Sequence, residues 1–252
     1  MDCASGDFRM IIGLDKVFKP VWVYKILQLS KSGNDFVEVK DEFLDIIEYD
    51  GKVAKRKTLT IIKRYYLKIE RKGNKYYFRK NYLHDLSLKY SFESMKPILL
   101  FVLLFNCPIA KFLQSKINVL FIDQKIINNK LLNEHAKETY GDRRVVSFAV
   151  NYYLTILSYF DIFNKEKDKY SWKNKKINLP NHILKEILIL YAQLKNDFEI
   201  DIATFQEETQ LSLFNLENLE STLMEYNSVD WVYQKRFDSK KVIIKNRYIN
   251  DL

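Results

Sequence analysis

The segment GKVAKRKTLTIIKRYYLKIERKGNKYYFRK, residues 51–80, decides both the predicted fold and the predicted function. Within residues 54–67, the apolar residues Leu59, Ile62 and Tyr66 recur at helical spacing, and Tyr65 flanks them. Two short stretches, 68–71 and 75–79, then flank Lys72-Gly73-Asn74, a turn signal because Gly and Asn tolerate positive φ. The segment therefore predicts a helix that leads into a β-hairpin.

Two further helices are predicted before this segment, at residues 21–29 after Pro20 and at residues 39–47. Three helices followed by a hairpin is the plan of a winged helix, a helix-turn-helix fold in which the third helix enters the major groove of DNA. The hairpin corresponds to the wing.

A similar pattern recurs twice along the chain. The second copy is predicted as helices at 124–139 and 143–159, with Asp142 as N-cap, then strands at 159–163 and 170–177 around a charged turn. It is preceded by helices at 92–106 and 109–117. The third copy is predicted as helices at 182–194, 203–210 and 216–226, then strands at 230–236 and 241–245 around Asp238-Ser239.

We therefore expect a mostly α protein with short β-hairpins, arranged as tandem winged-helix-like (helix-turn-helix) units. The expected regions are 1–90 for the first unit, 91–180 for a helical block with the second unit, and 181–252 for the third.

Positive charge is concentrated in one segment. The chain carries 41 Lys and Arg against 32 Asp and Glu, a net charge of +9. Residues 51–80 hold twelve of the basic residues and one acid, Glu70, whereas residues 204–252 hold six basic and eight acidic residues. Such segregation predicts a polyanion-binding face, although a solvated helix face is the simpler alternative.

The predicted DNA-contacting side chains lie on the third helix and the hairpin of the first unit, and on the third helix of the second. Arg can pair with guanine, Asn with adenine, and Lys and Thr mostly with phosphates. The set is Lys55, Arg56, Lys57, Thr60, Lys63, Arg64, Arg71, Lys72, Lys75 and Arg79, with Arg143, Arg144, Ser147 and Asn151.

The third unit is predicted to stay off DNA. Its last helix carries Glu217, Glu220 and Glu225, which would repel phosphates. We expect a protein-contacting or structural role for it.

Catalysis, metal binding and cofactors are not expected. His84, His135 and His182 are isolated, and no Gly-rich phosphate loop or nucleophile elbow occurs. The two cysteines, Cys3 and Cys107, lie far apart without metal-ligand spacing, which favours a reducing, cytoplasmic location. The most apolar stretch, residues 98–105, is much shorter than the roughly 20 residues of a membrane helix and predicts a buried helix.

The chain also resembles the small winged-helix DNA-binding proteins of bacterial BREX phage-defence systems (BrxA-like). The resemblance rests on Lys55-Arg56-Lys57 leading into residues 59–66, on the helical block 97–117, and on residues 142–163 as a helix-plus-strand unit. It covers about the first 180 residues. It implies binding of double-stranded DNA beside other proteins of a defence complex.

The sequence thus predicts a non-catalytic protein that binds double-stranded DNA and no membrane. Two alternatives stay open: a protein-interaction adaptor that acts through the acidic third unit, and the recognition subunit of a DNA-processing enzyme whose catalytic subunit is another chain.

Overall fold

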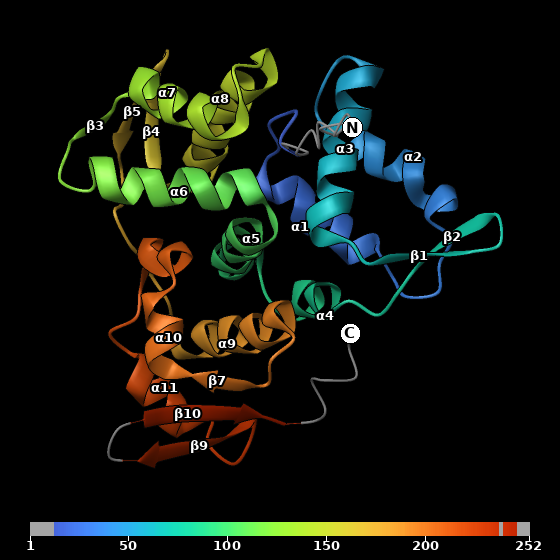
Figure 1. Ribbon diagram of the computed structural model, residues 1–252. Helices are drawn as coiled ribbons and strands as arrows, with labels where there is room; N and C mark the ends of the chain where they lie inside the picture. The colour runs from blue at the N-terminus through green and yellow to red at the C-terminus, as the bar shows by residue number, and fades with distance from the viewer. Residues whose placement is uncertain (1–12, 237–238, 246–252) are drawn as a thin grey trace, which may run out of the picture.

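The computed structural model describes residues 13–236 and 239–245, and within them the protein is mostly helical with short strands in small sheets (Figure 1). The elements fall into three groups that share one order: a helix, a strand, two helices and a hairpin. In each group the early strand pairs with the second strand of the hairpin.

The first group contains α1 (Pro20–Leu29), α2 (Phe36–Ile46), α3 (Lys52–Tyr66), β1 (Ile69–Lys72) and β2 (Lys75–Phe78). Asp35 begins α2, because its carboxylate accepts a hydrogen bond from the Val37 amide at 2.9 Å. Gly73, at φ +62°, lies in the two-residue turn of the hairpin. In this group an isolated bridge at residues 33–35 takes the place of the early strand: the Gly33 amide donates to the Phe78 carbonyl at 2.9 Å, and Asp35 bridges to Tyr77.

The second and third groups repeat this order. The second contains α6 (Pro108–Phe121), β3 (Ile126–Ile127), α7 (Asn129–Tyr140), α8 (Arg144–Tyr159), β4 (Phe163–Glu166) and β5 (Lys169–Trp172), with sheet order β3-β5-β4. The third contains α9 (Asn181–Lys195), β7 (Glu199–Asp201), α10 (Ile202–Glu207), α11 (Leu219–Glu225), β9 (Trp231–Arg236) and β10 (Ser239–Ile244), with order β7-β10-β9. Between α10 and α11 lie a 3-10 helix (Thr209–Leu213) and β8 (Phe214–Asn215), which pairs in parallel with β6 (Ile177–Asn178).

Two helices connect the first group to the second, α4 (Tyr82–Lys89) and α5 (Phe92–Asn106). α5 lies at the centre of the molecule, in contact with α1, α3 and α4 on one side and with α6 and α9 on others (Figure 1). It buries Met95 and every side chain from 98 to 104, so the predicted buried helix is confirmed. Elements of all three groups share one hydrophobic core around it.

Several predicted boundaries are wrong for local reasons. The helix predicted at 124–139 begins at Asn129, because Asn128 caps it and Ile126-Ile127 pair with β5. Asp142 does not cap α8; Arg143 holds that position, and Asp142 forms an ion pair with Lys137 at 2.7 Å.

The second hairpin is also shifted from its predicted place. Residues 159–163 were expected as a strand, but α8 continues to Tyr159. The predicted charged turn, residues 164–169, supplies paired strand residues instead, and the turn itself is Lys167-Asp168, with Lys167 at φ 54°. In the third group, α11 begins at Leu219 rather than 216, so Glu217 precedes it. The predicted turn residue Asp238 lies outside the described residues, and Ser239 belongs to β10.

Among the described residues no single helix is long and apolar enough to span a membrane. α5 and α6 satisfy that criterion only when taken together, and the chain bends by 102° between them.

Candidate nucleic-acid interface

The predicted recognition face is the solvent-facing side of α3. Arg56, Lys57, Thr60 and Arg64 are exposed, while Lys55 and Lys63 are half-buried. The opposite side is buried by Leu59, Ile62 and Tyr66, as the helical spacing predicts. Tyr65 is buried as well, and its hydroxyl donates to the Gly13 carbonyl at 3.1 Å. Burial raises the pKa of Tyr65, so the hydroxyl stays protonated.

Among the described residues, no acid neutralises the central cations of α3. Within the described part of the chain, no carboxylate forms an ion pair with Arg56, Lys57 or Lys63. Lys63 instead lies over two aromatic rings, with its ammonium nitrogen 4.7 Å from the centroid of Phe36 and 5.0 Å from that of Tyr76. A cation held in this way keeps its charge available to an incoming anion.

The Thr60 hydroxyl is less available to donate to a phosphate than its exposure to solvent implies. Its hydroxyl donates to the Arg56 carbonyl at 2.9 Å, one turn earlier in the same helix. The Thr60 oxygen can still accept a hydrogen bond, but phosphate oxygens are themselves acceptors and need a donor.

The hairpin divides its basic residues between two faces. Arg71 pairs in register with Tyr76, whose ring lies beneath Lys63, so Arg71 lies on the face that continues from α3. Lys72 and Lys75 pair with each other on the reverse face, where each meets an acid. Lys72 contacts Glu70 at 2.6 Å, and Lys75 contacts Asp35 at 3.7 Å.

Arg79 lies apart from the α3 face. It follows β2 and lines a hollow of about 560 Å³ together with Lys72, Tyr77 and Lys80, on the reverse side of the hairpin. The structure therefore brings Arg56, Lys63 and Arg71 toward one surface and places Lys72, Lys75 and Arg79 on another. Arg64 lies at the side of α3, where its guanidinium is 6.0 Å from the ring centroid of Tyr65.

In the second group, α8 presents a different surface. The Arg144 guanidinium lies 5.0 Å from the ring centroid of Phe148, which is 40% exposed and stacks on Tyr152. Ser147 and Asn151 are only half-exposed, and the side-chain oxygen of Asn151 already accepts a hydrogen bond from Asn129 at 2.7 Å. Arg143 donates to the Tyr140 carbonyl at 3.0 Å. The exposed Phe148 was not predicted, although it lies one helical turn after Arg144 and outside the buried stripe of α8.

In the third group the acids on and near α11 have partners within the protein. Glu220 accepts hydrogen bonds from Lys240 at 2.8 Å, Tyr233 at 3.1 Å and Lys235 at 3.2 Å. The bond from Lys240 contributes most to lowering the pKa of Glu220 to about 2. Glu225 accepts a bond from Asn181 at 2.6 Å, which lowers its pKa too.

A buried charged cluster on α9 was missed by the sequence analysis. Glu186 is fully buried and accepts hydrogen bonds from Tyr82, from Tyr90 at 2.8 Å and from Lys89 at 3.1 Å. Lys185 lies 3.2 Å from it. Burial alone would raise the pKa of Glu186, but the hydrogen bond from Tyr82 and the charge of Lys185 leave that pKa below its usual value. Helical spacing indicates which face is buried, not that a charged pair is buried with it.

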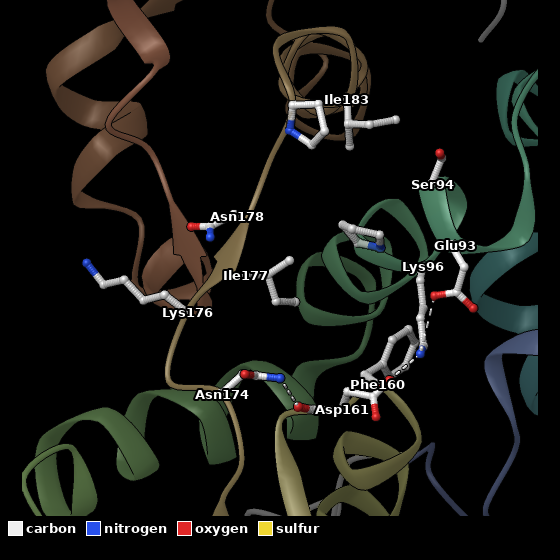
Figure 2. Close-up of a pocket in the computed structure, with 12 residues that line it drawn as sticks. Glu93, Ser94, Lys96, Phe160, Asp161, Asn174, Lys176, Ile177, Asn178 and Ile183 are labelled. Carbon is white, nitrogen blue, oxygen red and sulfur yellow. Dashed lines mark hydrogen bonds and ion pairs between the residues drawn. The ribbon is translucent and has the colours of Figure 1, made fainter.

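A cavity of about 450 Å³ lies between the start of α5, the end of α8 and the segment that leads into α9 (Figure 2). Three of its charged side chains are paired around the rim: Lys96 contacts Asp161 and also Glu93, the latter at 3.8 Å. Asn174 donates to the Asp161 carbonyl at 2.9 Å. Lys173 and Lys96 lower the pKa of Asp161 against the opposing effect of burial. These contacts tie the end of α8 to α5.

The histidines and Cys107 have ordinary surroundings. His84 contacts the Leu27 carbonyl at 2.7 Å, His135 contacts Glu138, and His182 stacks on Tyr90. Cys107 is buried, which raises the pKa of its thiol; Cys3 lies outside the described residues. In the described part of the chain, no three His, Cys, Asp or Glu side chains form a metal-binding group.

Comparisons of the chain with protein-family models, with curated proteins and with solved structures find no match. The resemblance to the BREX proteins therefore stays a prediction from the sequence.

Proposed function

We propose that the protein consists of tandem winged-helix units and binds double-stranded DNA through the first of them, where α3 and the α3-facing side of the β1–β2 hairpin hold the duplex. The observation that carries the proposal is the row of cations along the exposed side of α3, which meet no described carboxylate. A row of unpaired cations on a helix is the surface that a phosphate backbone fits.

The arrangement around α3 supports this assignment. α3 follows two helices and leads directly into a hairpin, whose second strand pairs with residues 33–35 between α1 and α2. This order matches a winged helix, in which the third helix reads the major groove and the hairpin reaches the adjacent backbone. Arg71 lies on the hairpin face that such a backbone would meet.

The charges of α2 favour one direction of approach. α2 exposes Glu38, Asp41, Glu42 and Asp45, which would repel a duplex. The duplex is therefore expected to approach from the side of α3 and Arg71. Long-range steering by this charge separation should also speed association at low salt.

The proposal is tested by the salt dependence of duplex binding. Replacing Arg56, Lys63 and Arg64 together with Ala should flatten the slope of log affinity against log salt by roughly two to three, because each phosphate contact contributes about 0.9. The fold should persist, since these side chains face solvent or an aromatic ring.

A matched control removes the same charge elsewhere. Lys25, Lys31 and Lys111 are exposed, and replacing them with Ala should leave the slope nearly unchanged. An equal loss of slope in both triple variants would mean that the α3 cations act only through the net charge of the protein. A parent protein without salt-dependent duplex binding would refute the proposal.

The proposed setting is a phage-defence complex with other proteins, and it rests on the sequence resemblance alone. The alternative function, a protein-interaction adaptor, is supported by the third group, where the apolar side chains of Met224, Val229 and Val232 are exposed.

A further inference from the structure

A hollow of about 310 Å³ lies between α2 and α3. Its lining combines an apolar floor with basic side chains from both helices: Phe36, Lys40, Arg56, Leu59, Thr60 and Lys63. Lys40 is the member that the sequence analysis did not consider, because α2 as a whole is acidic.

Three of the six lining side chains are cations and none is an acid. Neither Lys40, Arg56 nor Lys63 forms an ion pair with a carboxylate of the described residues. Like charges gathered around one hollow repel each other, and an anion placed between them would relieve that repulsion.

The acids of α2 do not counter this charge. By helical periodicity Glu38, Glu42 and Asp45 lie on the side of the helix opposite Lys40 and Asp41 lies on its flank, and none of the four lines the hollow. Lys40 is thus the one charged side chain of α2 that lines the hollow.

The polar groups of the hollow favour an anion over a neutral ligand. Thr60 already donates its proton to the Arg56 carbonyl, so the donors that remain are the charged groups. Lys63 is held against the Phe36 ring rather than by an acid, which orients its ammonium group without neutralising it.

We propose that this hollow binds a phosphate group of the DNA backbone, with Lys40 contributing a contact from α2 beside those of Arg56 and Lys63. The inference rests on the proposed function, and it assigns to α2 a positioning contact that fixes how α3 sits on the duplex. A phosphate suits the hollow because its oxygens accept hydrogen bonds from several cations at once.

The test compares three single variants in salt-titrated duplex binding. Lys40→Met removes the charge and keeps the apolar stem, so the fold should be retained. It should lower the salt slope by about 0.9, the value of one phosphate contact. Lys40→Arg keeps the charge and should have the slope of the parent. Lys25→Met removes an exposed charge from α1 and should also leave the slope unchanged.

The outcomes separate this inference from the proposed function. If the parent shows no salt-dependent duplex binding, the proposed function fails and the inference fails with it. If the parent binds and depends on Arg56, Lys63 and Arg64, but Lys40→Met and Lys25→Met behave alike, only the inference is overturned.

A second arm distinguishes a backbone phosphate from a free one. Inorganic phosphate is added to the parent and to Lys40→Met, and thermal unfolding is followed. If phosphate stabilises the parent alone while Lys40→Met binds duplex with an unchanged slope, the hollow is a site for a small anion, and its assignment to DNA is wrong.

Discussion

Glu220 illustrates how one side chain can join a helix to a hairpin. It projects from α11 and accepts hydrogen bonds from Lys235 on β9 and Lys240 on β10. The two cations that would otherwise repel each other across the register therefore share one carboxylate. The acid that was predicted to repel DNA thus has a structural use within its own group.

The stability of the protein should depend on the ionisation of Glu220. Its folded pKa of about 2 lies below the unfolded value of 4.5, so the stabilisation is fully present above pH 4.5 and is lost as pH falls toward 2. We expect Glu220→Gln to reduce the free energy of unfolding at pH 7 by at most about 1 kcal/mol, because the pair is screened by solvent.

The measurement is urea unfolding of both proteins at pH 7 and at pH values approaching 2. The difference between them should shrink as the pH falls. A difference that stays constant over this range would mean that Gln disturbs packing rather than removing a charge.

At the scale of the element, the β1–β2 hairpin should use its two faces unequally. Arg71 lies on the α3 side, whereas Lys72 and Lys75 face away and meet Glu70 and Asp35. Arg71→Ala should therefore weaken duplex binding and lower the salt slope by about 0.9, and Lys72→Ala should change it less.

Both variants are compared on several duplexes of unrelated sequence. Contacts to the backbone carry no sequence information, so Arg71→Ala should weaken all of them by similar factors. A larger effect of Lys72→Ala would place the duplex on the reverse face of the hairpin.

Helices with regular apolar spacing were the best predicted elements. α1, α3 and α5 lie within a few residues of their expected bounds, because burial of one face determines each. The short strand β3 was missed, since Ile126-Ile127 also fit a helix and only pairing with β5 decides between the two. α4 was missed entirely.

The candidate site was predictable in part for the same reason. Exposure of the α3 cations follows from periodicity within one helix, whereas the hollow beside Lys40 depends on how α2 packs against α3. Likewise, the Asn129 contact that occupies Asn151 joins two helices. The spacing of residues predicts which face of a helix is buried. Contacts between two helices can be identified only in the folded structure.

At the scale of the molecule, Glu186 connects distant parts of the chain. It lies on α9 and binds Tyr82 and Lys89 of α4 and the nearby Tyr90, while Lys185 beside it approaches Asp230 at 3.7 Å. These contacts are buried or half-buried, so they hold the α4 region against the third group.

Replacing Glu186 with Leu should destabilise the whole protein by about 3–5 kcal/mol, because it takes the nearer carboxylate from the buried Lys185 and the acceptor from the Tyr82 and Tyr90 hydroxyls. The measurement is the free energy of unfolding in urea. Glu93→Gln is the control: this exposed carboxylate should matter by no more than about 0.5 kcal/mol. Similar small effects of both substitutions would show that Asp230 alone is a sufficient partner for Lys185.

If the protein binds DNA as proposed, the central position of α5 has a consequence for the duplex as well as for the protein. Packed interiors switch between discrete arrangements rather than deforming smoothly, so groups that share this helix cannot swivel freely against each other. A duplex that touches two of them must match a fixed spacing, and the helix axis of the DNA takes up any mismatch by bending. Because the energy of bending differs between base-pair steps, such a protein would choose among sites by their flexibility at positions that no side chain reaches.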